Sequence, residues 1–154
     1  MQITDTSNAT KKDVVVELVS DKDYKLITKE KYHFNWKNEK QNSVFKLRLY
    51  ESEEILGLMS LKHFEDEMRF EIKLLEVSKV NVGKKKRYEG IAGNLIAYAC
   101  REAISTHAEN GCVSLTPKTK LKKHYMEKYG MLDAGIQIFL EGRAIFGLLK
   151  TYAL

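Results

Sequence analysis

The stretch GKKKRYEGIAGN, residues 83–94, sets four consecutive basic residues shortly before three small residues at the start of an apolar helical pattern. The small residues are Gly90, Ala92 and Gly93. The first N–H groups of a helix have no partner within the helix and carry the positive end of its dipole. Because these three positions carry at most a methyl group, a bulky anion can approach the backbone there. The stretch therefore predicts a phosphate-binding loop, with the basic residues adding charge around it.

The elements on either side of this stretch decide between an anion site and a plain solvated loop with Gly90 as its turn residue. Residues 70–82 before it are predicted as a strand whose apolar phase slips, which is typical of a bulge. From Ile91 the apolar period becomes helical, and Gly111 marks the end of that helix. Ligands tend to bind at the carboxyl ends of strands in such α/β arrangements, so the sequence favours the anion site.

Alternating apolar residues predict further strands on both sides of this strand and helix. A second helix is expected over residues 116–130, and residues 21–43 carry no clear pattern. Residues 136–142 and 143–150 are predicted as a closing pair of strands. This order of elements predicts a mixed sheet with helices packed on it. The remaining predicted strands cover residues 13–20, 43–50, 54–64 and 111–117.

The composition fits one globular domain with a sizeable core, since the chain has 154 residues of which 44% are hydrophobic. The polar start, residues 1–12, lacks the apolar run of a secretory signal and is expected to be a flexible tail. No stretch is long enough to span a membrane. Cys100 and Cys112 lack metal-ligand spacing, so we expect reduced thiols and a cytoplasmic location. The net charge of +5 and the pI near 9.1 favour an anionic partner, either nucleic acid or a phosphate-bearing cofactor.

Two motifs give the sequence a resemblance to a known family. RYEGIA, residues 87–92, matches the signature Gln/Arg-x-x-Gly-x-Gly/Ala, and HYMEKYGM, residues 124–131, is similar to a helix that carries a tyrosine before a Gly-Phe pair, with Met131 in place of the Phe. With these motifs the sequence resembles the Gcn5-related N-acetyltransferases over residues 55–150. The resemblance implies a single, mostly antiparallel twisted sheet of six to seven strands with helices on both faces. It also implies a splayed central pair of parallel strands, and one domain over residues 13–154.

The same resemblance implies an enzyme that binds acetyl-coenzyme A and transfers its acetyl group to a primary amine of a small molecule or a protein. The pyrophosphate is expected on the loop of residues 87–93, and the pantetheine arm where the strands over residues 70–82 and 111–117 splay apart. Backbone N–H groups near Val80 and Val82 are candidates to polarise the thioester carbonyl. Lys118 stands where the family often has an asparagine. The implied coenzyme contacts are Val80, Val82, Arg87, Tyr88, Glu89, Gly90, Ile91, Ala92, Gly93, Lys118 and Tyr125.

Direct attack of an amine on the thioester requires a base for the ammonium and an acid for the leaving thiolate. Glu76, on the strand before the loop, is the candidate base, with Glu71 or water as the alternatives. Tyr125 is the candidate acid, because the family's tyrosine at this position points its hydroxyl at the coenzyme sulfur; alternatively, its ring only packs in the helix. His124 is expected on the solvated side of that helix. No metal site is predicted, because no pair of histidines has ligand spacing.

The sequence does not identify the acceptor, because the aromatic run KYHFNWK, residues 31–37, has no pattern; its Trp36 either lines an acceptor pocket or packs on the sheet. The alternative function is a non-catalytic module that binds coenzyme A or a polyanion such as nucleic acid. The lysines concentrate at one helix mouth and do not alternate with aromatic residues, which argues against nucleic acid. A homodimer is compatible with the sequence.

Overall fold

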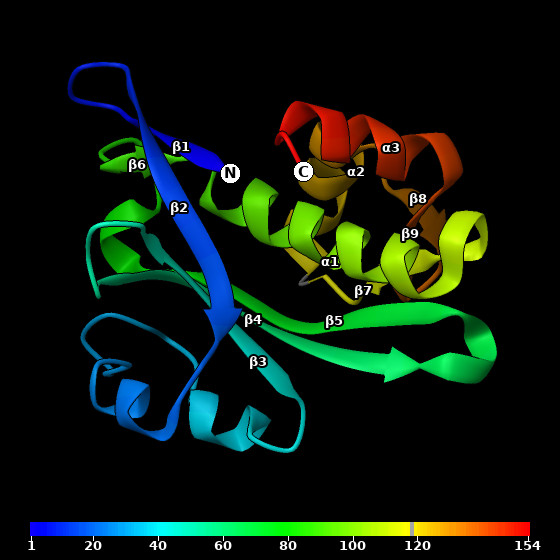
Figure 1. The fold of residues 1–154 in the computed structure, drawn as a ribbon, viewed down its shortest axis with the longest axis horizontal. Coiled ribbons are helices and arrows are strands. Elements are labelled where there is room, and N and C mark those ends of the chain that lie inside the picture. The colour runs from blue at the N-terminus through cyan, green and yellow to red at the C-terminus, as the bar shows by residue number, and fades with distance from the viewer. Residues whose placement is uncertain (118) are drawn as a thin grey trace. The chain divides into compact units, whose positions relative to one another are not determined.

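The computed structural model describes residues 1–117 and 119–154, and within these ranges it has one sheet of nine strands and three α-helices. The strands are hydrogen-bonded in the order β6-β1-β2-β3-β4-β5-β7-β9-β8 (Figure 1). The structure confirms the predicted mixed α/β class, although it has more strands than the six to seven expected. Lys118, a predicted coenzyme contact, lies outside the described residues.

The chain divides into two compact units. The first comprises residues 1–60 and 74–95, and the second comprises residues 61–73 and 96–154. Three elements contribute residues to both units, namely β4 (Ile55–Phe64), β5 (Arg69–Val77) and α1 (Ile91–His107). Within the part of the chain that the structure describes, no helix has the length and apolar character needed to cross a membrane.

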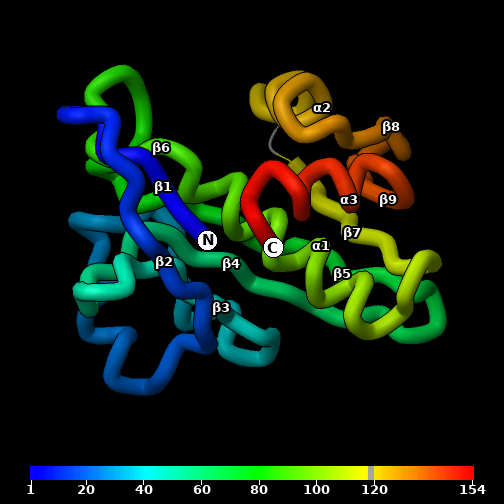
Figure 2. The backbone as a smooth tube through the Cα atoms, turned by 45° about the horizontal axis from the view of Figure 1, so that its top comes forward, coloured from blue at the N-terminus to red at the C-terminus, as the bar shows by residue number. Residues whose placement is uncertain are grey.

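The N-terminal residues form a hairpin in the first unit, where the sequence predicts a flexible tail over residues 1–12. β1 (Gln2–Asp5) pairs antiparallel with β2 (Thr10–Leu18) on one edge and with β6 (Tyr88–Glu89) on the other. Figure 2 shows this N-terminal segment beside the segment that carries β6. Hydrogen bonds on both edges satisfy the backbone of this short strand, so one buried apolar side chain, Ile3, is enough to place it. The polar composition therefore led to a wrong prediction.

The unassigned residues between β2 and β3 (Ser43–Leu49) form two short 3-10 helices, η1 (Asp21–Lys25) and η2 (Trp36–Glu39). Burial of aromatic side chains explains why this segment folds without a regular period. The rings of Tyr32 and Trp36 are buried, and the Tyr32 hydroxyl donates to the backbone oxygen of Ile55 at 2.7 Å. The buried core of this region comprises Tyr32, Trp36, Val44, Ile55 and Leu58.

β5 is shorter than the strand predicted over residues 70–82. It ends at Val77, and the 3-10 helix η4 (Lys79–Asn81) follows. The side chains of Val80 and Val82 are mostly exposed. The slip in the apolar pattern therefore coincides with the place where the chain leaves the sheet.

The second unit contains the parallel pair that the sequence predicts. Residues 69–72 of β5 pair with the whole of β7 (Cys112–Leu115). β7 also pairs antiparallel with β9 (Gln137–Glu141). The outer edge of β9 carries β8 (Leu132–Ala134), a strand that was not predicted. The pairing thus places β7 between a parallel and an antiparallel neighbour.

The two predicted helices are present. The predicted stripe of α1 is buried, and after α1 the chain turns at Gly111, where an added Cβ would lie 2.5 Å from the Ala103 carbonyl oxygen. Only glycine fits that close approach. α2 (Lys122–Tyr129) ends at Gly130, whose φ of 70° is the left-handed conformation of a helix C-terminus. The fully buried residues of the α1 stripe include Leu95, Ile96, Ala99, Cys100 and Ala103.

The chain ends in a helix, α3 (Gly142–Thr151), so the strand predicted over residues 143–150 is wrong. Ile145 and Leu148 are buried while Phe146 is half exposed, and a spacing of three is that of a helix face. The segment is apolar nearly throughout, and for such runs periodicity alone does not separate a strand from a helix. Figures 1 and 2 both show α3 beside α2.

Ile145 and Phe146 offer a direct test of the helical face. We expect Ile145→Ala to lower the free energy of unfolding by about 2–5 kcal/mol, because it leaves a cavity among buried side chains. Phe146→Ala, at the exposed neighbouring position, should change it by less than about 1 kcal/mol. Urea unfolding of both variants measures the difference, and equal losses would contradict the assigned face.

Candidate active site

The predicted phosphate loop is held in place by the N-terminal hairpin of the first unit. The hydroxyl of Thr6 donates to the backbone oxygens of Lys86 and Arg87 at 2.6 Å and 3.0 Å, and the Thr6 N–H donates to the Arg87 oxygen at 2.9 Å. β6 then pairs with β1 through Tyr88 and Glu89. The residues once expected to be a tail therefore position the loop.

Two buried asparagines fix the ends of the loop. The side chain of Asn81 accepts the Tyr88 N–H at 3.0 Å, and its amide donates to the Ser78 hydroxyl at 2.8 Å. The Asn94 amide donates to the backbone oxygens of Gln2 and Gly90 at 2.8 Å and 2.7 Å. The Tyr88 N–H is already hydrogen-bonded and the Tyr88 ring is buried. These two groups of Tyr88, a predicted coenzyme contact, are therefore not available to a ligand.

The start of α1 has the features of an anion site. Gly90 has a φ of 100°, which side chains rarely adopt, and it turns the chain into the helix at Ile91. The N–H groups of Ile91, Ala92 and Gly93 form the first turn, where a helix has no acceptors of its own. Their geometry and the helix dipole suit a phosphate group. The residues present therefore fit the pyrophosphate that the sequence resemblance implies.

The basic residues before the helix are mostly solvated. Lys84 and Lys85 are exposed, Lys86 pairs with Glu89 at 3.2 Å, and the Arg87 guanidinium lies 5.0 Å from the centre of the Tyr88 ring. Lys84, Lys85 and Arg87 can turn toward an anion without losing a salt bridge to the described residues. The Glu89 side chain is committed to Lys86, so its predicted contact with the coenzyme would be through its backbone.

Glu76, the candidate base, anchors the aromatic segment. Its buried carboxylate accepts the backbone N–H groups of His33 at 2.6 Å and Phe34 at 3.2 Å, and the indole N–H of Trp36 at 2.9 Å. Three hydrogen bonds compensate the burial of its charge. These contacts assign Glu76 a positioning role, which the sequence analysis did not foresee, and leave its role as a base untested.

Glu71, the alternative base, lies in the second unit and is also engaged. Its carboxylate accepts a hydrogen bond from the Gln137 amide at 3.0 Å and pairs with Lys73 at 3.2 Å. Arg69 is 3.9 Å away and donates to the Ser114 hydroxyl. Glu71 thus belongs to a charge network over β5, β7 and β9.

A second buried carboxylate holds η1 in the first unit. Asp23 pairs with Lys46 at 2.8 Å and accepts bonds from the Ser20 N–H and hydroxyl. Burial acts to raise the pKa of Asp23, but the hydrogen bonds from Lys46 and Ser20 outweigh it and hold the pKa below its usual value. Asp23 therefore stays ionised and fastens the segment that carries Tyr24.

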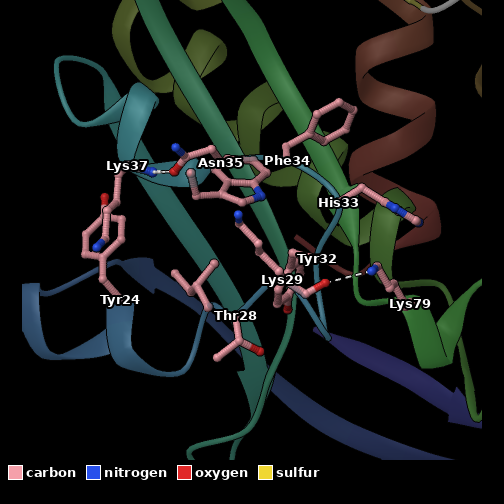
Figure 3. A pocket seen from close by; sticks show the side chains of 11 residues that line it. Tyr24, Thr28, Lys29, Tyr32, His33, Phe34, Asn35, Lys37 and Lys79 are labelled. Carbon is pink, nitrogen blue, oxygen red and sulfur yellow. Dashed lines mark hydrogen bonds between the residues drawn. The ribbon is translucent and has the colours of Figure 1, made fainter.

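Between these two anchors lies a pocket of about 470 Å³ (Figure 3). In Figure 3 the side chain of Lys29 points into its interior, and the Lys79 ammonium ends on the Lys29 backbone oxygen at 2.7 Å. Its volume is in the range of small-molecule sites. Trp36, for which the sequence left two roles open, is buried in the core and also lines this pocket. The lining residues are Tyr24, Ile27, Thr28, Lys29, Tyr32, His33, Phe34, Asn35, Trp36, Lys37 and Lys79.

Tyr125, the candidate acid, lies on α2 in the second unit. Its ring stacks on Tyr129 with the ring centres 5.8 Å apart. Burial raises the pKa of the Tyr125 hydroxyl, so the group keeps its proton at neutral pH. The neighbouring His124 is exposed, as predicted. The position of Tyr125 is therefore compatible both with a role as the acid and with a role in packing alone.

The sequence missed two groupings that only the fold creates. The pocket lysines Lys29, Lys37 and Lys79 are spread over fifty residues and have no common motif. His63 and His107, which appear scattered in the sequence, face each other with their Nε2 atoms 2.7 Å apart. Among the described residues, no group of three His, Cys, Asp or Glu side chains is placed to hold a metal ion.

Comparisons with known proteins identify the fold. No protein-family model and no curated protein matches the sequence. Ard1 from Thermoplasma volcanium is 12% identical with a TM-score of 0.61, over 84% of this chain and 97% of that one. An acetyltransferase of the GNAT family from Bacillus cereus is 14% identical with a TM-score of 0.58, over 84% and 98%. Arabidopsis thaliana Naa50, in complex with the bisubstrate analogue CoA-Ac-MVNAL, is 14% identical with a TM-score of 0.53, over 82% and 95%. The chain thus has the fold of the Gcn5-related N-acetyltransferases.

Replacing the Glu76 carboxylate tests its role as an anchor. We expect Glu76→Gln to lower the free energy of unfolding by about 1–3 kcal/mol, because the amide turns a donor toward at least one buried N–H. Urea unfolding followed by the fluorescence of Trp36, the only tryptophan in the sequence, reports on the same segment. The exposed Glu30→Gln is the control, and a Glu76→Gln variant as stable as this control would contradict the anchoring role.

Proposed function

We propose that this chain, which has the fold of the Gcn5-related N-acetyltransferases, transfers an acetyl group from acetyl-coenzyme A to a primary amine. The observation that carries the proposal is the start of α1, where Gly90 precedes a helix whose first turn contains the small residues Ala92 and Gly93 and follows a basic loop. The structure of Naa50 with a coenzyme A bisubstrate analogue supports the same donor for a chain of this fold.

The loop residues would hold the coenzyme by its phosphates. The N–H groups of Ile91, Ala92 and Gly93 are the donors to the pyrophosphate, and Arg87 with Lys84 and Lys85 surrounds it with charge. Of the other predicted contacts, Val80 and Val82 follow the end of β5 with exposed side chains. The coenzyme would supply the thioester carbon and the leaving thiolate.

The reaction forms a C–N bond and breaks a C–S bond. The nitrogen of the acceptor ammonium loses two protons, one released before the attack and one afterwards, and the leaving thiolate takes up one proton. We propose Tyr125 as the acid, because burial keeps its hydroxyl protonated. We propose the pocket of Figure 3 as the acceptor site, since it borders Lys79 in the segment that leads to the loop. Water or Glu76 would accept the proton of the ammonium.

The variant Glu76→Gln separates the two roles of Glu76. Loss of an anchor lowers the rate at every pH, whereas loss of a base removes the rise of the rate with pH.

Coenzyme binding is the primary test, because it needs no acceptor. At a hundred times the dissociation constant, acetyl-coenzyme A should stabilise the folded chain by about 2.7 kcal/mol, which raises the melting temperature by about 5–10 °C. Ala92→Glu should abolish this shift, since it places an anion in front of the helix N–H groups. An acidic residue in the first turn is favourable for the helix itself, so the variant should remain folded.

The exposed Ala134→Glu on β8 is the matched control for this substitution and should keep the full shift. A wild-type chain that melts identically with and without saturating coenzyme would refute the proposed function and favour a polyanion-binding module.

Tyr125→Phe tests the acid. We expect turnover to fall about 10²- to 10⁴-fold while the affinity for the coenzyme is kept, because only the proton donor is lost. Tyr129→Phe removes a hydroxyl from the stacked neighbour and should leave turnover nearly unchanged. Steady-state kinetics with an acceptor and a coenzyme-binding titration measure both, and equal turnover in wild type and Tyr125→Phe would exclude this role.

A further inference from the structure

We infer that the acceptor carries an anionic group, a carboxylate or a phosphate, which the pocket binds through Lys29 and Lys37. This inference rests on the proposed function and names the chemical class of its acceptor. It comes from the chemistry of the pocket lining, in which the charged groups all have one sign.

The groups available in the pocket are donors. Within the described residues, the ammonium groups of Lys29 and Lys37 have no salt bridge or hydrogen bond. Figure 3 shows Lys29 reaching into the pocket between Thr28 and Asn35. The Asn35 side-chain oxygen already accepts the Lys37 N–H at 3.3 Å, so its amide group remains to donate. Lys79, whose ammonium donates to the Lys29 backbone oxygen, adds a third positive charge to the lining. Such a set matches a carboxylate or phosphate, whose oxygens only accept.

Among the residues that the structure describes, no Asp or Glu lines the pocket to offset these charges. The nearest carboxylate that binds its lining residues is Glu76, and its oxygens take up the N–H groups of His33, Phe34 and Trp36. A simple alkylamine is a cation at neutral pH and would be repelled by three lysines. An amine that also bears a carboxylate or phosphate is attracted through that anion, so the pocket favours acceptors that carry one.

The same lysines would assist the chemistry. Positive charge near a bound ammonium disfavours its charged form and lowers its pKa. The neutral amine is the nucleophile, and its proton can then leave to water. The anion therefore holds the acceptor in a field that also activates it, which makes a dedicated carboxylate base unnecessary.

Matched pairs of amines test the inference without coenzyme. Phosphoethanolamine is compared with ethanolamine, and β-alanine with β-alaninamide, by titration at constant ionic strength while the fluorescence of Trp36 is followed. We expect at least one anion-bearing amine to bind about tenfold or more tightly than its partner that lacks the anion. Whichever pair shows the larger difference identifies phosphate or carboxylate as the recognised group.

The double variant Lys29→Ala/Lys37→Ala should weaken binding of the anion-bearing amine about tenfold and remove its advantage over the partner that lacks the anion. Lys22→Ala/Lys25→Ala removes the same charge from the same segment outside the pocket, and should keep both. Equal binding of the amines with and without the anion, no fluorescence change with any probe, or equal losses in the two double variants would each overturn the inference.

Kinetics with the preferred amine give a second readout. In Lys29→Ala/Lys37→Ala the rise of kcat with pH should move to higher pH, because kcat reports the enzyme–substrate complex, in which the bound ammonium loses the charges that lower its pKa. An unmoved profile would overturn the activating role of the lysines. The melting scan with acetyl-coenzyme A is independent of the pocket, so it shows separately whether the proposed function fails.

Discussion

The buried Glu76 carboxylate is the interaction on which the first unit depends. A segment without regular structure must still satisfy its buried N–H groups, and Glu76 takes two of them together with the indole N–H of Trp36. These donors also compensate the buried negative charge of Glu76, which forms no salt bridge with a described residue. The wall of the pocket and the end of β5 are thereby joined by one side chain.

The predicted phosphate loop and the pocket both depend on the same few residues after Glu76. The Lys79 N–H donates to the Lys31 oxygen and its ammonium to the Lys29 oxygen, which closes the pocket. Two residues later, Asn81 receives the Tyr88 N–H and so orients the loop. A substitution in this short segment is therefore expected to alter both the pocket and the predicted phosphate loop.

Local patterns predicted those parts of the chain whose structure is decided locally. The stripe of α1, its glycine-flanked start and the end of α2 at Gly130 follow from side-chain spacing and from the backbone freedom of glycine. α3 was missed because an apolar run fits a strand and a helix equally well until the packing of Ile145 and Leu148 selects one face. β1 and β8 were missed because short edge strands depend on their partners more than on their own composition.

The sequence by itself determined the class of fold and the position of the loop before α1 that we propose as the phosphate site, since helix periodicity, small residues and a run of charge act over neighbouring positions. It also indicated Glu76 as the candidate base and Tyr125 as the candidate acid. Only the tertiary structure decided what Glu76 contacts, because its three donors come from residues 40 to 43 positions earlier in the chain. The pocket depends on the fold for the same reason. Nothing in the sequence distinguishes Lys29 and Lys37 from other surface lysines. Only the fold places them in the lining of one cavity, together with Lys79 and the buried aromatic rings.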